Sequence, residues 1–167
     1  MELLVYPKVV IVENHSSAGE PYNNGDLFEV YVRRLFKRSD FDLLYETKRD
    51  PADSRKTNLE KKPDFQMLHK RSGHSFWIKC RYNGDNDGHE LDWCDPDQLA
   101  CYKQFQEDVW PEQFYMVIGY GGRPMKPSAL ICIPLDKTEH CEIEPKALEL
   151  YKRDPSRPFD CQKGHLA

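Results

Sequence analysis

Residues 63–82 read PDFQMLHKRSGHSFWIKCRY. Two segments rich in aromatic and aliphatic residues, 64–70 and 74–82, flank the turn-forming residues 71–73. Two such segments joined by three residues that include a glycine are typical of an antiparallel hairpin. The sequence therefore predicts adjacent antiparallel strands over 64–70 and 74–82.

The second predicted strand alternates between two kinds of side chain. One face carries Phe76, Ile78, Cys80 and Tyr82, and the other carries Trp77, Lys79 and Arg81. Because successive side chains of a strand point to opposite faces, Lys79 and Arg81 lie on the same face. A shift of the pairing by one residue would move both cations into the core, so this alternation fixes the register.

Helices and further strands are predicted on both sides of the hairpin. Apolar residues at helical spacing predict a helix from Asp26 to about Lys37. A second helix is predicted over 96–108, with Asp95 as its N-cap and Pro96 at its first position. Further predicted elements are strands over 41–47, 114–120 and 129–135, a loop over 83–97 and a short helix near Ala147. The apolar runs 3–6 and 9–12 indicate an extended N-terminal segment that could add an edge strand. This order predicts an α/β fold with a mixed β-sheet flanked by helices.

Composition limits the class of protein. The chain has 167 residues, of which 39% are hydrophobic and 31% charged, as in soluble globular proteins. We expect a single domain over 1–167, with a core at about 25–135, an N-terminal extended segment 1–24 and a polar C-terminal extension 136–167. The net charge of −4 argues against coating nucleic acid through overall charge, but it leaves room for a local basic patch.

The cellular compartment is indicated by the N-terminus, the apolar runs and the cysteines. Glu2 stands where a signal peptide has a positive charge, and no apolar run reaches the roughly 18 residues that span a bilayer. The sequence therefore predicts a cytoplasmic location and no membrane partner. The six cysteines match no zinc-ligand spacing and are expected to be reduced thiols.

Four short motifs, in the order helix, strand, strand, helix, resemble a known superfamily. Residues 25–32 read GDLFEVYV, residues 63–64 read PD, residues 76–82 read FWIKCRY and residues 98–102 read QLACY. Their order and placement resemble the PD-(D/E)xK nuclease superfamily over roughly Gly25 to Leu135. The resemblance implies the restriction-endonuclease-like fold.

The resemblance also implies roles for particular residues. In that superfamily a helix glutamate, a hairpin aspartate and the acid of the third motif hold Mg²⁺, and a lysine steadies the attacking water. Glu29 matches the helix acid and Asp64 matches the hairpin aspartate. Carboxylate oxygens are the ligands that Mg²⁺ prefers. Gln98 and Tyr102 match a Q-x-x-x-Y motif that some of these nucleases place beside nucleic acid.

The third motif departs from the family pattern. Lys79 stands at the position of the acid, and Arg81 stands at the position of the lysine. Glu29, Asp64, Lys79 and Arg81, the four candidate catalytic positions, then carry charges that sum to zero. Two unit charges about 4 Å apart interact by roughly 4 kcal/mol at an effective dielectric constant near 20, so a cation at a ligand position opposes metal binding. We expect Lys79 to pair with Asp64 or Glu29 in place of the metal, and an arginine at position 81 is a poor base.

The sequence thus predicts a nuclease-fold protein that is catalytically impaired and binds nucleic acid, such as DNA, or a protein partner. No cofactor is expected in this interpretation. Lys61 and Lys62, at the end of a basic stretch over 48–62, are candidate contacts to phosphates, together with Gln98 and Tyr102.

Two alternative interpretations stay open. The first is an active Mg²⁺-dependent DNA endonuclease with a rearranged site, in which Glu29 and Asp64 hold one ion. The second is a structural or interaction module that shares only the fold. In that case Glu29 pairs with Arg33 four residues along its helix, and Lys79 and Arg81 form an exposed cationic face.

Overall fold

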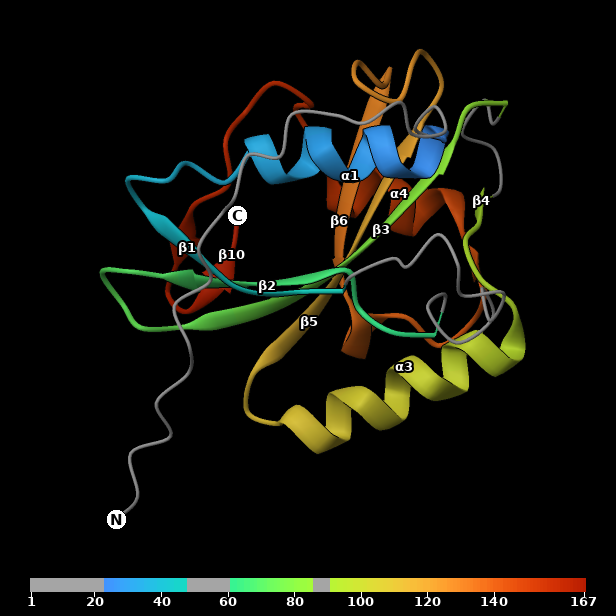
Figure 1. Ribbon diagram of the computed structural model, residues 1–167. Helices are drawn as coiled ribbons and strands as arrows, with labels where there is room; N and C mark the ends of the chain where they lie inside the picture. Colours follow the sequence, from blue (N-terminus) through green and yellow to red (C-terminus); the bar gives the residue numbers. More distant parts are fainter. Residues whose placement is uncertain (1–22, 48–60, 86–90) are drawn as a thin grey trace, which may run out of the picture.

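The computed structural model describes residues 23–47, 61–85 and 91–167 (Figure 1). The extended N-terminal segment predicted around the runs 3–6 and 9–12 and most of the basic stretch 48–62 lie outside the described residues.

A six-stranded mixed sheet with the order β1-β2-β3-β5-β6-β8 forms the centre of the structure (Figure 1). Its strands are β1 (Phe41–Glu46), β2 (Phe65–His69), β3 (Ser75–Asn83), β5 (Gln113–Tyr120), β6 (Ala129–Pro134) and β8 (Lys152–Arg153). β3 and β5 are parallel, and every other neighbouring pair is antiparallel. The predicted hairpin is confirmed, since Phe65 is paired with Ile78 in antiparallel register. The predicted strands over 41–47, 114–120 and 129–135 are also present, within one residue at each end.

Helix α1 (Asn24–Arg34) covers one face of the sheet (Figure 1). The sequence predicted its start at Asp26, but the helix begins two residues earlier. The Asn23 side chain accepts a hydrogen bond of 2.8 Å from the Asp26 backbone N–H and so caps the first turn. The helix ends at Arg34 rather than near Lys37. The Leu35 N–H donates to the Val32 carbonyl and the Phe36 N–H donates to the Arg33 carbonyl, which tightens the last turn.

Close packing fixes α1 against the sheet at Gly119 of β5. A Cβ atom at this position would lie 2.4 Å from a ring carbon of Phe28, which is completely buried. The helix can approach this closely only because residue 119 has no side chain.

We expect Gly119→Ala to destabilise the protein by about 1 to 3 kcal/mol, since the new methyl group forces Phe28 and its helix outward. Chemical denaturation measures this change. Gly73→Ala is the control, because no atom lies within 4 Å of its added Cβ and only its positive φ of 74° is strained. Equal losses from both variants would contradict the packing argument.

Helix α3 (Pro96–Val109) covers the opposite face, and its predicted cap is confirmed. Asp95 accepts a bond from the Gln98 N–H, and the Gln98 side chain accepts one from the Asp95 N–H, which makes a reciprocal capping box. Tyr102 is completely buried beneath the helix and lies edge-on to Phe114 of β5. The sheet therefore separates two cores, one under α1 and one under α3.

The loop predicted over 83–97 contains an unpredicted strand. β4 (Leu91–Asp92) pairs with β7 (Glu142–Ile143), and the side chains of Leu91 and Ile143 are buried. The prediction of an uninterrupted loop is wrong here, because a two-residue strand has no periodicity and forms through its distant partner.

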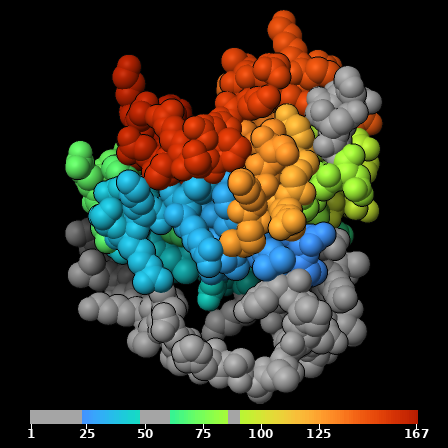
Figure 2. Space-filling model, turned by 90° about the horizontal axis from the view of Figure 1, so that it is seen from above, coloured from blue at the N-terminus to red at the C-terminus, as the bar shows by residue number. Residues whose placement is uncertain are grey.

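The residues after β6 pack onto the core. They form η1 (Leu135–Lys137), α4 (Pro145–Tyr151), β8, β9 (Cys161–Gln162) and β10 (His165–Leu166). The Phe159 ring stacks on Phe36 at 4.4 Å, and its N–H bonds to the Leu35 carbonyl at 2.8 Å. Figure 2 shows this C-terminal segment, in red, against the blue and cyan surface of α1 and β1. α4 confirms the short helix predicted near Ala147.

Two other predictions from the sequence have structural outcomes. All six cysteines lie among the described residues and none of them is in a disulfide there, while their redox state stays a prediction. Within the described ranges, no helix is both long and apolar enough to cross a membrane.

Candidate active site of a nuclease-like fold

Asp64 lies in the turn that leads into β2, at the centre of the candidate site. Its N–H donates a bond of 2.8 Å to the Ile78 carbonyl, which ties this residue to β3. Its side chain is buried, and both oxygens are engaged. Oδ1 accepts a bond of 3.0 Å from Lys79 Nζ, and Oδ2 accepts one of 2.7 Å from the Cys80 N–H.

Lys79 is buried with only 4% of its surface exposed, although lysine is rarely buried without a partner. It lies in the middle of β3, on the opposite face from its neighbours Ile78 and Cys80, as the alternation predicted. The predicted ion pair between Lys79 and Asp64 is present at 3.0 Å. The alternative of an exposed cationic face is therefore wrong for Lys79.

Glu29 reaches the site from α1. Its side chain is only 13% exposed and pairs with Arg33 at 2.8 Å, while Arg33 also pairs with Glu46 of β1 at 2.6 Å. Burial, and next the negative charge of Asp64, raise the pKa of Glu29 to about 7, although Arg33 and Lys79 oppose the rise. The charge of Asp64 raises the pKa of Glu29 and the charge of Lys79 lowers it, so the three residues form one electrostatic cluster.

Arg81 and Tyr102 form a second group beside this cluster. Burial raises the pKa of the Tyr102 phenol, and the charge of Arg81 and a hydrogen bond with Arg81 oppose the rise. The Nε atom of Arg81 is buried and has no hydrogen-bond partner within the described part of the chain. Arg81 also lines a hollow of about 460 Å³ together with Asn83, Trp93 and Gln98.

The remaining predicted site residues are Gln98, Lys61 and Lys62. The Oε1 atom of Gln98 is occupied by the helix cap, so its structural role is evident, whereas contact with nucleic acid stays a prediction. Lys61 and Lys62 immediately precede Pro63 and Asp64, and neither side chain makes a hydrogen bond or ion pair with another described residue.

Sequence reasoning did not find the full set of interactions. The spacing of Glu29 and Arg33 indicated their pairing, but nothing in the sequence joined Glu46 to them. Glu46 lies on β1, 13 residues after Arg33, and only the folded sheet brings the two together. The Cys80 N–H was also missed, because a backbone donor leaves no signal in the sequence.

The donor set does not fit a Mg²⁺ ion. Each Asp64 oxygen already accepts a hydrogen bond, Glu29 is paired with Arg33, and Lys79 stands at the position where the family motif predicted an acid. Over the ranges 23–47, 61–85 and 91–167, no three His, Cys, Asp or Glu side chains are grouped so that they could hold a metal ion. The geometry provides a buried and charge-compensated cluster with Arg81 beside it, and Lys61 and Lys62 precede Asp64 in the chain.

The pKa of Glu29 predicts a pH dependence of stability. Because the folded-state pKa is raised from 4.5 to about 7, the stability linked to this proton is fully present below about pH 4.5 and is lost as the pH rises through 7. Relative to Glu29→Gln, we expect the parent to lose about 2 to 3 kcal/mol of unfolding free energy between pH 5 and 8.

Urea denaturation at both pH values measures this loss. Glu46→Gln is the matched control, since it removes the other partner of Arg33 and leaves Glu29 to titrate. Identical pH profiles of the parent and Glu29→Gln would contradict the burial of a titrating Glu29.

Comparison with known proteins identifies the fold. No family model and no curated protein matches the chain. A Holliday junction resolvase, Hjc from the archaeal hyperthermophile Archaeoglobus fulgidus, has a similar structure, with a TM-score of 0.51 and 12% sequence identity. The similarity covers 74% of this chain and 90% of the resolvase. The chain has the fold of the PD-(D/E)xK nucleases. The restriction-endonuclease-like architecture predicted from the sequence is thus confirmed, and the roles of individual residues in this nuclease fold stay predictions.

Proposed function

We propose that this nuclease-fold protein has lost metal-dependent hydrolysis and retains binding of nucleic acid. The buried ion pair between Lys79 and Asp64 is the observation that carries the proposal. A cation with 5% side-chain exposure replaces an oxygen ligand, so the cluster is stabilised by charge pairing within the chain rather than by Mg²⁺.

Binding of DNA is supported by Lys61 and Lys62, which immediately precede Pro63 and Asp64 in the chain, and by Arg81. Lys61 and Lys62 have no ionic partner among the described residues, and Arg81 retains an unsatisfied buried N–H beside the hollow. Phosphate oxygens satisfy such donors, and arginine binds them through its planar group of N–H donors. The fold shared with a Holliday junction resolvase makes duplex and four-way-junction DNA the appropriate probes.

Fluorescence anisotropy with labelled duplex and junction DNA tests the binding. We expect Lys61→Gln/Lys62→Gln to weaken binding and to reduce the salt dependence, the slope of log K against log salt, by about 2. Lys146→Gln/Lys152→Gln on and after α4 is the control, because it removes the same charge from other exposed positions. No salt-dependent binding of either DNA by the parent would overturn the proposal.

A protein partner is the second candidate. Among the strands that the structure describes, β1 is an edge of the sheet, and its Leu44 and Tyr45 are 41% and 42% accessible. An exposed edge strand with apolar side chains favours pairing with another chain. Analytical ultracentrifugation of the parent and Leu44→Lys tests pairing with a second copy. Self-association that this variant abolishes supports the candidate, and a monomer at all concentrations contradicts it for a second copy.

A further inference from the structure

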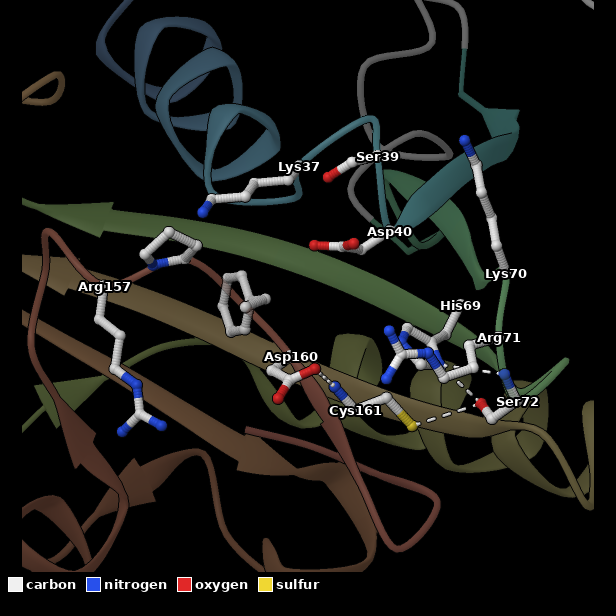
Figure 3. Close-up of a pocket in the computed structure, with 12 residues that line it drawn as sticks. Lys37, Ser39, Asp40, His69, Lys70, Arg71, Ser72, Arg157, Asp160 and Cys161 are labelled. Carbon is white, nitrogen blue, oxygen red and sulfur yellow. Dashed lines mark hydrogen bonds between the residues drawn. The ribbon is translucent and has the colours of Figure 1, made fainter.

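A hollow of about 810 Å³ lies at the other end of the β2–β3 hairpin from Asp64 (Figure 3). Asp64 precedes the first residue of β2, whereas the hollow begins at His69, so the two sites are roughly 15 Å apart along the strand. Three segments line it: the connection from α1 to β1, the hairpin turn, and the C-terminal segment before β9.

The walls of the hollow are joined to one another. His69 Nδ1 lies 2.8 Å from Ser72 Oγ, which closes the hairpin turn. Ser72 Oγ lies 3.6 Å from Cys161 Sγ, and this contact joins the turn to the C-terminal segment. The bond from the Phe159 N–H to the Leu35 carbonyl joins that segment to the end of α1. The hollow is therefore largely preformed, as ligand sites usually are.

Positive charge predominates in the lining. Four cations, Lys37, Lys70, Arg71 and Arg157, face two carboxylates, Asp40 and Asp160, which leaves two positive charges in excess in a chain of net charge −4. An anion is therefore attracted to this hollow in spite of the overall charge.

Three of the four cations are available to a ligand. Lys70 is already held by the Arg38 carbonyl at 2.5 Å and by Asp42 at 3.4 Å. The side chains of Lys37, Arg71 and Arg157 make no hydrogen bond or ion pair with the rest of the described structure. Figure 3 shows that they come from different walls, with Arg71 on the hairpin turn and Lys37 and Arg157 on the α1 and C-terminal sides.

We propose that this hollow binds a phosphorylated ligand of about nucleotide size, with its phosphate held by Lys37, Arg71 and Arg157. Arginine presents planar pairs of donors that match phosphate oxygens, and two of the three available cations are arginines. The carboxylates of Asp40 and Asp160 repel a bare anion but accept hydrogen bonds from hydroxyl groups. The ligand that fits both kinds of group carries a phosphate beside a sugar. A volume of about 810 Å³ also suits a nucleotide better than inorganic phosphate.

Two sources supply this chemistry, a free nucleotide and the phosphorylated end of a nucleic acid strand. Isothermal titration calorimetry of the full chain with AMP, with a 5′-phosphorylated trinucleotide, and with malonate as a non-phosphate dianion distinguishes them. We expect AMP or the trinucleotide to bind at least tenfold more tightly than malonate. Tighter binding of AMP identifies the ligand as a free nucleotide, and tighter binding of the trinucleotide identifies it as the end of a strand.

Variants test whether the phosphorylated probes bind in this hollow. Arg71→Gln/Arg157→Gln, at two exposed positions, is expected to weaken binding of the preferred probe at least tenfold, and Lys146→Gln on α4 is expected to leave it unchanged. Unchanged binding in the double variant, equal binding of malonate, or no binding of either phosphorylated probe would overturn the proposal. Lys61→Gln/Lys62→Gln keeps this hollow intact, so a failure here is separable from a failure of DNA binding near Asp64.

Discussion

Asp64→Ala is expected to lower the free energy of unfolding by about 3 to 5 kcal/mol, since it leaves the Lys79 ammonium buried without its partner. Both side chains of the pair are only 5 to 6% exposed, so water cannot replace the lost carboxylate cheaply. The variant also leaves the Cys80 N–H without its acceptor. Urea denaturation in chelator and in Mg²⁺ measures the change.

A double-mutant cycle separates the ion pair from the backbone bond. Asp64→Asn keeps an oxygen for the Cys80 N–H, and Lys79→Met removes the cation while retaining similar bulk. We expect the double variant to lose about 1 to 3 kcal/mol less unfolding free energy than the two single variants lose together. A vestigial metal site is a cluster of like charges, so an Asp64→Ala protein more stable than the parent in chelator would contradict the paired site and favour the active nuclease.

Lys79→Glu with Arg81→Lys is expected to create a Mg²⁺ response that the parent lacks. The change places a third carboxylate beside Glu29 and Asp64, so in chelator the variant is less stable than the parent because like charges cluster in a buried site. If 10 mM Mg²⁺ is about ten times the dissociation constant, binding restores roughly 1.4 kcal/mol, or about 3 to 6 °C in the melting temperature.

Thermal melts in chelator and in Mg²⁺ measure this response. Lys79→Gln with Arg81→Lys is the matched control, since it removes the same cation and adds no ligand. A Mg²⁺ response in the control or in the parent as large as in the variant would show that Lys79 does not replace a metal ligand.

Local patterns in the sequence predicted the elements that local interactions form. Strand alternation placed Lys79 opposite the apolar residues of β3, and Asp95 followed by Pro96 located the start of α3. The charge balance of the motif positions then predicted that Lys79 pairs with Asp64 or Glu29, and the structure contains the pair with Asp64. These features depend on residues that are close together in the chain, so they can be predicted from the sequence alone.

The parts that sequence reasoning missed depend on distant contacts. β4 and β7 form only because residues 91–92 and 142–143 meet in the fold. The hollow at the hairpin turn combines Arg71 with Arg157, which are 86 positions apart. Asn23 lies in a segment rich in loop-forming residues, so the earlier start of α1 became evident only from its capping bond. No periodicity in the chain links such residues.

Nicking of supercoiled plasmid DNA by the purified full chain, in Mg²⁺ and in Mn²⁺, tests the loss of hydrolysis most directly. The paired site predicts that the parent produces no more nicked product than Asp64→Asn, which lacks the candidate ligand charge and whose folding is checked by circular dichroism. Nicking by the parent that requires a divalent ion and disappears in Asp64→Asn would contradict the account and establish an active nuclease with a rearranged site.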